Sequence, residues 1–287
     1  MIADTDDEML TGAKAIEGAP FGWEVPTDLT QNLSADVRDA LARIYRRDGL
    51  LLFRNQSLTM DQQLDACEIF GPVLRGAMDN YLVSNVAEGG LLGNVELLFH
   101  NDIPFVPEPY LGGSLHAVDV DEDGAAPTRF ASAFRAWDKL PEPLKVRLER
   151  LNALQVQGHM LDRRTTLADL TSGDSCAVHS VMGRQEGTDR PYLFVNLDMT
   201  ACITALPADE SDALLEELFA YLYDPANIYE HRWTKGDFVI WDNLAIQHAR
   251  SAFGNADRTL QRVTIGRLGF WEQVPASLPL YQALQEV

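Results

Sequence analysis

The 287-residue sequence predicts one α+β domain, residues 1–287, whose mainly β core is a sandwich or barrel. Two observations support this prediction. Short strand-like segments dominate the middle and the end of the chain, and helical segments lie before and between them. No repeat, low-complexity linker or break in composition divides the chain. About 30 residues at the amino end, rich in Gly, Pro, Asp and Thr, are expected to be peripheral.

The first helix is predicted over residues 34–49. Ser34 can cap its amino end, and Gly49 can end it by adopting a left-handed conformation. Further helical segments are expected at the end of 127–140, at 141–151 and at 207–224.

A second helix is predicted over residues 59–72, where Thr59 and Gln62 can form a capping box and Gly71-Pro72 can stop the helix. Strands are predicted in short apolar runs rich in β-branched and aromatic residues, and the run 50–55 is predicted to be buried. These runs are 50–55, 110–120, the start of 127–140, 191–197, 236–243 and 261–271.

Composition excludes several classes of partner. The formal net charge is −20, from 43 acidic and 23 basic residues. Such a chain is repelled by nucleic-acid phosphates and by anionic membranes, so we expect neither as a partner. An anionic ligand must therefore be held by locally placed arginines. A homo-oligomer remains open, because the sequence does not specify an oligomeric state.

The cysteines and the amino end predict a cytoplasmic protein. Cys67, Cys176 and Cys202 are odd in number and show neither a disulfide framework nor zinc-site spacing, so free thiols are expected. The amino end lacks the basic and apolar segments of a signal peptide. No apolar run approaches the roughly 20 residues that span a bilayer.

The segment ELLFHNDIPFV, residues 96–106, places a histidine and an aspartate in an apolar run. On a strand, residues i and i+2 project from the same face, so His100 and Asp102 are expected to point together. A buried carboxylate is costly unless its charge is paired or binds a metal. The two residues therefore form either a structural hydrogen-bonded pair or two of three ligands for a cation.

A third candidate ligand, His248, follows the apolar run GDFVIWDN, in which Asp242 and Asn243 are expected to shape a turn. Two histidines and one carboxylate match the facial triad of non-haem Fe(II) enzymes. Arg258 and Arg262 follow on a predicted strand and share one face. Arginine binds carboxylates through two parallel hydrogen bonds, so this pair suggests an anionic ligand beside the metal.

Six segments in this order resemble the taurine dioxygenase/TfdA-type family of Fe(II)- and 2-oxoglutarate-dependent dioxygenases. The resemblance covers about residues 48 to 268. The segments are LLFRNQSLTMDQQLDACEIFGPV, FHNDIPFVPEPYLGGSLHAVDV, APTRFASAFRAWDKLP, YLFVNLDMTACITALPADES, GDFVIWDNLAIQHAR and RTLQRVTIGR.

The resemblance implies a double-stranded β-helix (jelly roll) flanked by helices, with Fe(II), 2-oxoglutarate and dioxygen as cofactor and cosubstrates. It also implies site residues. His100, Asp102 and His248 match the iron ligands, and Thr128 and Arg258 match the residues that bind the distal carboxylate of 2-oxoglutarate. Arg262 matches an arginine near the cosubstrate that contacts the substrate anion in sulfonate-using members, and a structural ion pair is the alternative.

The implied reaction oxidises a small organic metabolite by hydroxylation or desaturation and releases succinate and CO2. An amino-acid-like compound and a natural-product intermediate are both compatible. The chain departs from the family at Leu244, where many members have arginine, and it lacks the histidine of sulfonate-using relatives after Gly71-Pro72. Related halogenases replace the carboxylate that Asp102 matches, so halogenation is disfavoured.

Two alternatives remain open. The same iron site could serve cyclisation, epimerisation or rearrangement, or the chain could be a catalytically silent jelly-roll binding protein. Substrate contacts are expected from loops 74–98 and 158–190, with side chains identified by position only: Asn80, Tyr81, Asn94 and Glu96. The remaining histidines, His116, His159, His179 and His231, are expected to be core or surface residues.

Overall fold

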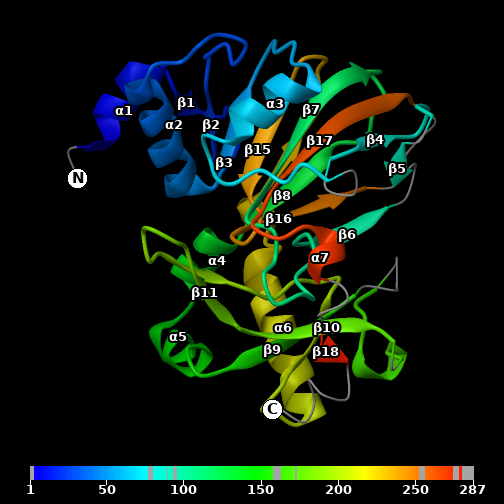
Figure 1. The fold of residues 1–287 in the computed structure, drawn as a ribbon. Coiled ribbons are helices and arrows are strands. Elements are labelled where there is room, and N and C mark those ends of the chain that lie inside the picture. The colour runs from blue at the N-terminus through cyan, green and yellow to red at the C-terminus, as the bar shows by residue number, and fades with distance from the viewer. Residues whose placement is uncertain are drawn as a thin grey trace.

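The computed structural model describes residues 3–76, 80–88, 90–92, 96–157, 163–171, 173–251, 256–273 and 278–279. Figure 1 shows an upper tier of two sheets flanked by α1, α2 and α3, and a lower tier built around α6 and a third sheet. The helices are α1 (Ala3–Thr11), α2 (Ala35–Asp48), α3 (Met60–Cys67), α4 (Ala133–Lys139), α5 (Glu142–Leu148), α6 (Ala208–Leu222) and α7 (Phe270–Gln273). Two 3-10 turns are η1 (Leu167–Asp169) and η2 (Pro225–Asn227).

Two sheets form the upper tier. The larger runs in the order β1 (Lys14–Ala15), β2 (Trp23–Glu24), β3 (Leu50–Phe53), β15 (Phe238–Asp242), β7 (Gly112–Val120), β17 (Arg258–Ile265), β4 (Leu82–Ser84), β5 (Leu91–Leu92). The smaller runs β14 (Ile228–His231), β8 (Thr128–Ser132), β16 (Ile246–Arg250), β6 (Leu97–His100).

The lower tier contains a third sheet and a hairpin. The sheet runs β13 (Thr200–Ile203), β9 (Asn152–Val156), β10 (Ser175–Ser180), β18 (Leu278–Pro279). The hairpin pairs β11 (Met182–Arg184) with β12 (Pro191–Leu193). Helices α4 and α6 pack on these strands through a large apolar cluster that includes Phe134, Trp137, Leu218 and Phe219.

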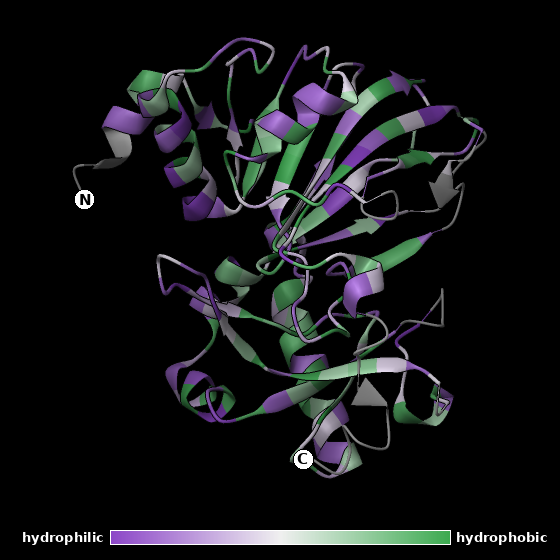
Figure 2. Cartoon of the chain, in the orientation of Figure 1, coloured by the Kyte–Doolittle hydropathy of each residue, from purple (hydrophilic) through white to green (hydrophobic). Residues whose placement is uncertain are grey.

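Strand periodicity explains how the large sheet lies between two cores. Along β3, Leu51 and Phe53 pack toward α2 and α3, whereas Leu50 and Leu52 pack into the space between the two upper sheets. Figure 2 shows hydrophobic residues along the strands of the large sheet and many hydrophilic residues on α1 and α2. Two facing sheets with helices outside form the predicted jelly roll.

The capping predictions are confirmed. The Ser34 hydroxyl accepts a hydrogen bond from the Val37 amide, and Gly49 adopts φ 75° at the carboxyl end of α2. Thr59 and Gln62 form the capping box of α3. Helix α3 ends at Cys67, earlier than predicted, because the following amides of Ile69 and Phe70 turn back to carbonyls three residues before them.

Two segments differ from the sequence-based expectation. Residues 261–271 were predicted as one strand, but β17 ends at Ile265 and a helical turn follows, in which the Gly269 amide donates to Glu272 Oε2. Helix α1 was not predicted; it packs on α2, where Asp7 accepts hydrogen bonds from the Arg43 guanidinium. Within the part of the chain that the structure describes, no helix has the length and apolar character needed to cross a membrane.

Candidate metal centre and carboxylate pocket

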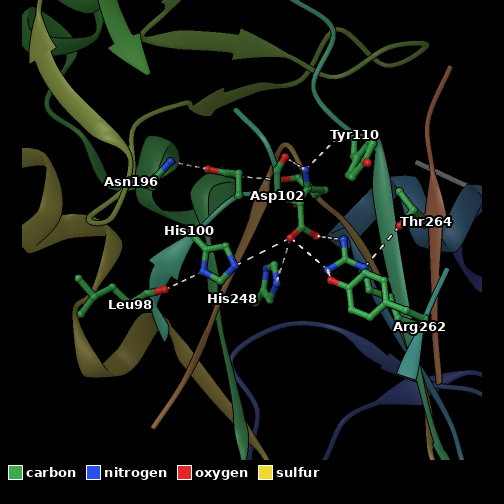
Figure 3. Close-up of polar contacts among 11 residues, drawn as sticks. Leu98, His100, Asp102, Tyr110, Asn196, His248, Arg262 and Thr264 are labelled. Atoms are coloured by element: carbon green, nitrogen blue, oxygen red, sulfur yellow. Dashed lines mark hydrogen bonds and ion pairs between the residues drawn. The ribbon is translucent and has the colours of Figure 1, made fainter. Parts of the chain in front are cut away.

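The side chains of His100, Asp102 and His248 lie close together at the end of strand β6 in the small sheet. Strands β6 and β16 pair so that His100 lies opposite His248, and their ring centroids are 4.2 Å apart. Asp102 Oδ1 lies 3.9 Å from the Nε2 atom of each histidine. The three potential ligand atoms lie within 4.8 Å of one another, and all three residues are buried (Figure 3).

Asp102 reaches this position from a turn, which corrects the expectation that it shares a strand face with His100. Strand β6 ends at His100, and Ile103 adopts φ 44°. The side chain of Asn243 holds the turn: its Oδ1 accepts from the Asp102 amide at 2.7 Å, and its Nδ2 donates to the carbonyls of Asp102 and Tyr110. The predicted turn role of Asn243 therefore extends to the segment that carries Asp102.

Hydrogen bonding fixes the tautomer of His100. Its Nδ1 lies 2.7 Å from the Leu98 carbonyl oxygen, so Nδ1 carries the proton and donates. The Nε2 lone pair is then directed toward Asp102 and His248, as a metal ligand requires. The Nδ1 atom of His248 is buried and finds no partner among the described residues.

Arg262 crosses from the large sheet and binds the carboxylate of Asp102. Its Nη2 donates to Oδ2 at 2.7 Å, and its Nη1 lies 3.3 Å from Oδ1 and 3.1 Å from the Tyr81 hydroxyl. The structural ion pair left open by the sequence is therefore present (Figure 3). Burial alone would raise the pKa of Asp102, but the attraction of Arg262, with smaller contributions from the two histidine rings, outweighs burial and lowers the pKa to about 2.

His248 is uncharged at neutral pH. Burial, together with the neighbouring His100 and despite the attraction of Asp102, lowers the pKa of His248 to about 3. A neutral imidazole keeps a lone pair available for a metal, so no proton must leave this ring at pH 7. The site offers two imidazole nitrogens and one carboxylate oxygen, all from buried residues. This is a donor set that suits Fe(II).

A small cavity adjoins His248 between the two sheets. It is lined by Val83, Leu97, Leu115, Thr128, Trp241, His248, Ala249, Arg250, Arg258 and Arg262. The predicted residues Thr128 and Arg258 thus lie together beside a metal-site histidine. Arg258 Nη1 donates to the Ala126 carbonyl at 2.8 Å, and the Thr128 hydroxyl accepts from Trp233 Nε1 at 3.1 Å.

Arg250 in this cavity was missed by the sequence analysis. It is buried, and burial lowers its pKa to about 10. Burial and the charge of Arg250 lower the pKa of Arg258 to about 9. A signal was available in the spacing: Arg250 lies two residues after His248, so on a strand the two side chains project from the same face.

The expected loop residues have mixed outcomes. Asn80 serves the backbone, since its Nδ2 donates to the Leu74 carbonyl and its Oδ1 accepts from the Thr264 amide. Tyr81 contacts Arg262, Glu96 is exposed, and Asn94 lies outside the described residues. The three cysteines are free thiols.

Comparison with known proteins identifies relatives over most of the chain. The family model "Taurine catabolism dioxygenase TauD, TfdA family" matches residues 9–264. Pentalenolactone F synthase of Streptomyces avermitilis is 29% identical, covering 87% of this chain and 89% of the relative. The alpha-ketoglutarate (2-oxoglutarate)-dependent 2,4-dichlorophenoxyacetate dioxygenase of Cupriavidus pinatubonensis is 30% identical, covering 83% and 91%.

A solved structure shares the fold. The crystal structure of AAD-2 in complex with Mn(II) and N-oxalylglycine superimposes with a TM-score of 0.75 at 21% identity, covering 90% of this chain and 98% of that one. At this identity the similarity establishes the jelly-roll architecture alone.

Proposed function

Because the chain belongs to the TauD/TfdA family of 2-oxoglutarate-dependent dioxygenases, we propose that His100, Asp102 and His248 hold Fe(II) and that Thr128 and Arg258 bind the distal carboxylate of 2-oxoglutarate. The observation that carries this assignment is the adjacency of the two features. His248 belongs to the candidate metal triad and also lines the cavity that contains Thr128 and Arg258.

The enzyme oxidises a small organic molecule with Fe(II), 2-oxoglutarate and dioxygen, and it releases succinate and CO2. Iron held by His100, Asp102 and His248 would supply the activation of dioxygen. The protein residues supply geometry and charge. His100 is oriented by the Leu98 carbonyl, and Arg262 neutralises Oδ2 of Asp102 while Oδ1 faces both imidazoles.

Hydroxylation or desaturation is the proposed outcome. The carboxylate of Asp102 is present and buried at the metal centre, which disfavours halogenation. Arg262 is already paired with this carboxylate, so its proposed place beside the cosubstrate comes with a second role in holding Asp102. Product mass separates the alternatives, since hydroxylation adds one oxygen, desaturation removes two hydrogens and epimerisation changes neither.

We propose that this is a cytoplasmic enzyme with one catalytic domain spanning residues 1–287 and a peripheral amino end. Free thiols at Cys67, Cys176 and Cys202 support a reducing compartment. The net charge of −20 supports a small-molecule substrate rather than nucleic acid or an anionic membrane as the partner. A homo-oligomer is compatible with these features.

Anaerobic optical titration tests the assignment. Adding Fe(II) and then 2-oxoglutarate to the metal-free protein is expected to produce a weak visible charge-transfer band only when both are present. His248→Ala should abolish the band, whereas His116→Gln, which changes a buried histidine outside the triad, should retain it. No band in a folded wild-type protein would favour a metal-free binding protein and would remove the proposed ligand roles.

A further inference from the structure

The cavity beside His248 contains more arginines than the single one, Arg258, that was predicted with Thr128 to bind the carboxylate. Three arginines line it: Arg250, Arg258 and Arg262. Arg262 binds Asp102 through two contacts, and Arg250 and Arg258 line the same cavity. Arg250 and Arg258 are 4% and 3% exposed. Both guanidiniums are therefore enclosed in the protein.

The two guanidiniums approach the cavity from opposite sheets. Arg250 ends β16 and lies directly across from Thr128 of β8 in the small sheet. Arg258 begins β17 in the large sheet. Because Arg250 follows His248 by two residues on the same strand, its side chain lies on the face that carries the metal ligand. Thr128, the two arginines and His248 thus line one cavity.

Like charges confined in a buried cavity repel one another, and an anion bound between them relieves that repulsion. A carboxylate suits this position because its two oxygens accept about four hydrogen bonds. Two planar guanidiniums and one hydroxyl can satisfy these acceptors together. One arginine and one hydroxyl would leave part of the carboxylate without donors.

We propose that Arg250 is a second carboxylate-binding residue of the cosubstrate pocket and shares the distal carboxylate with Arg258 and Thr128. This inference rests on the proposed function. It gives the pocket a chemical preference: 2-oxo acids with a distal carboxylate bind far more tightly than 2-oxo acids of similar length that lack it.

Ligand binding to the Fe(II)-loaded protein tests the inference without turnover. Anaerobic titrations measure Kd for 2-oxoglutarate and for 2-oxovalerate, which has no distal carboxylate, in wild type, Arg250→Gln and Arg258→Gln. Loss of a charged hydrogen-bond partner is expected to raise Kd for 2-oxoglutarate about ten-fold or more in Arg250→Gln. Kd for 2-oxovalerate should change by less than about three-fold. Lysine at position 250 keeps the positive charge but cannot donate two parallel hydrogen bonds to a carboxylate. The Kd of Arg250→Lys for 2-oxoglutarate should therefore lie between the values of wild type and Arg250→Gln.

Controls separate this inference from the proposed function. Arg232→Gln removes the same charge from an exposed side chain and should leave both Kd values unchanged. If Arg258→Gln reduces the preference for 2-oxoglutarate but Arg250→Gln does not, Arg250 is no carboxylate ligand and the proposed function stands. If Arg250→Gln and Arg250→Lys raise Kd for 2-oxoglutarate and for 2-oxovalerate by the same factor, the role of Arg250 is structural. No binding of 2-oxoglutarate to wild type would overturn the proposed function itself.

Discussion

The hydroxyl of Thr128 is oriented by a residue outside the cavity. The indole N–H of Trp233 can only donate, and it lies 3.1 Å from Thr128 Oγ1. That contact occupies an acceptor position of the hydroxyl. Among the described residues, the Thr128 hydroxyl makes no other hydrogen bond, so its own proton is left for a ligand in the cavity. Trp233 is therefore a positioning residue for the proposed carboxylate contact.

Replacing Trp233 by Phe is expected to raise Kd for 2-oxoglutarate about three- to ten-fold, because the Thr128 hydroxyl loses the donor that orients it. Trp137→Phe is the matched control, since Trp137 is also buried but packs in the apolar cluster of α4 and α6 and does not line the cavity. Anaerobic titration of the Fe(II) protein measures both. Thr128→Val should remove the effect of Trp233→Phe, and independent effects of the two changes would contradict the orienting role.

The sequence predicted that Arg258 and Arg262 share a strand face, but it did not predict their different partners. At about 3.3 Å per residue, four positions on a strand separate their Cα atoms by about 13 Å. Arg258 therefore lies beside Thr128, whereas Arg262 reaches Asp102. This difference depends on where the turn after β6 lies, which no local pattern specifies.

At the scale of elements, the turn between β15 and β16 fixes the metal centre. Asn243 in this turn binds the backbone of Asp102 on both sides and the carbonyl of Tyr110. The Asn101 side chain returns a hydrogen bond to the Asn243 carbonyl at 2.6 Å. The sequence predicted a turn at Asn243 and a histidine after it. The contact to a segment 141 residues earlier required the strand pairing.

Asn243→Ala is expected to lower the free energy of unfolding by about 3 kcal/mol, because buried backbone groups of Asp102 and Tyr110 lose their partners. The affinity for Fe(II) should also fall as Asp102 becomes mobile. Urea denaturation and metal titration measure the two effects. Asn152→Ala, at an exposed strand position, should change stability by less than about 0.5 kcal/mol. Equal stability of the two variants would argue against the turn as a structural support.

The pairing of β6 with β16 shows which part of the site the sequence could specify. The sequence analysis placed His100 in an apolar run and His248 after the predicted strand 236–243, and the residue types of the triad indicated its chemistry. The register that places His100 opposite His248 is a long-range property, since a shift of one residue would turn either side chain to the other face. The resemblance to a family supplied that information, and hydrophobic periodicity did not.

At the scale of the whole molecule, burial within the fold keeps several histidines neutral. His116, His231 and His248 are buried, and burial is the main cause of the lowered pKa of each, from an ordinary value of 6.5. In the unfolded chain these rings take up protons near pH 6.5, while in the folded protein they resist protonation. The unfolded state therefore binds more protons below this pH, and the free energy of unfolding falls as pH decreases.

Between pH 6.5 and 5.5, each buried histidine is expected to remove at most about 1 kcal/mol of stability from the metal-free protein, or at most about 3 kcal/mol for the three. Urea denaturation in the presence of a chelator at pH 7.5, 6.5 and 5.5 measures the loss. His116→Gln isolates one contribution, because glutamine can still donate to the Gln56 carbonyl that His116 Nε2 contacts at 3.2 Å but does not titrate. The variant should lose less stability than wild type over this interval. An equal loss in both proteins would mean that buried carboxyls or surface charge, rather than histidine burial, set the acid sensitivity of the fold.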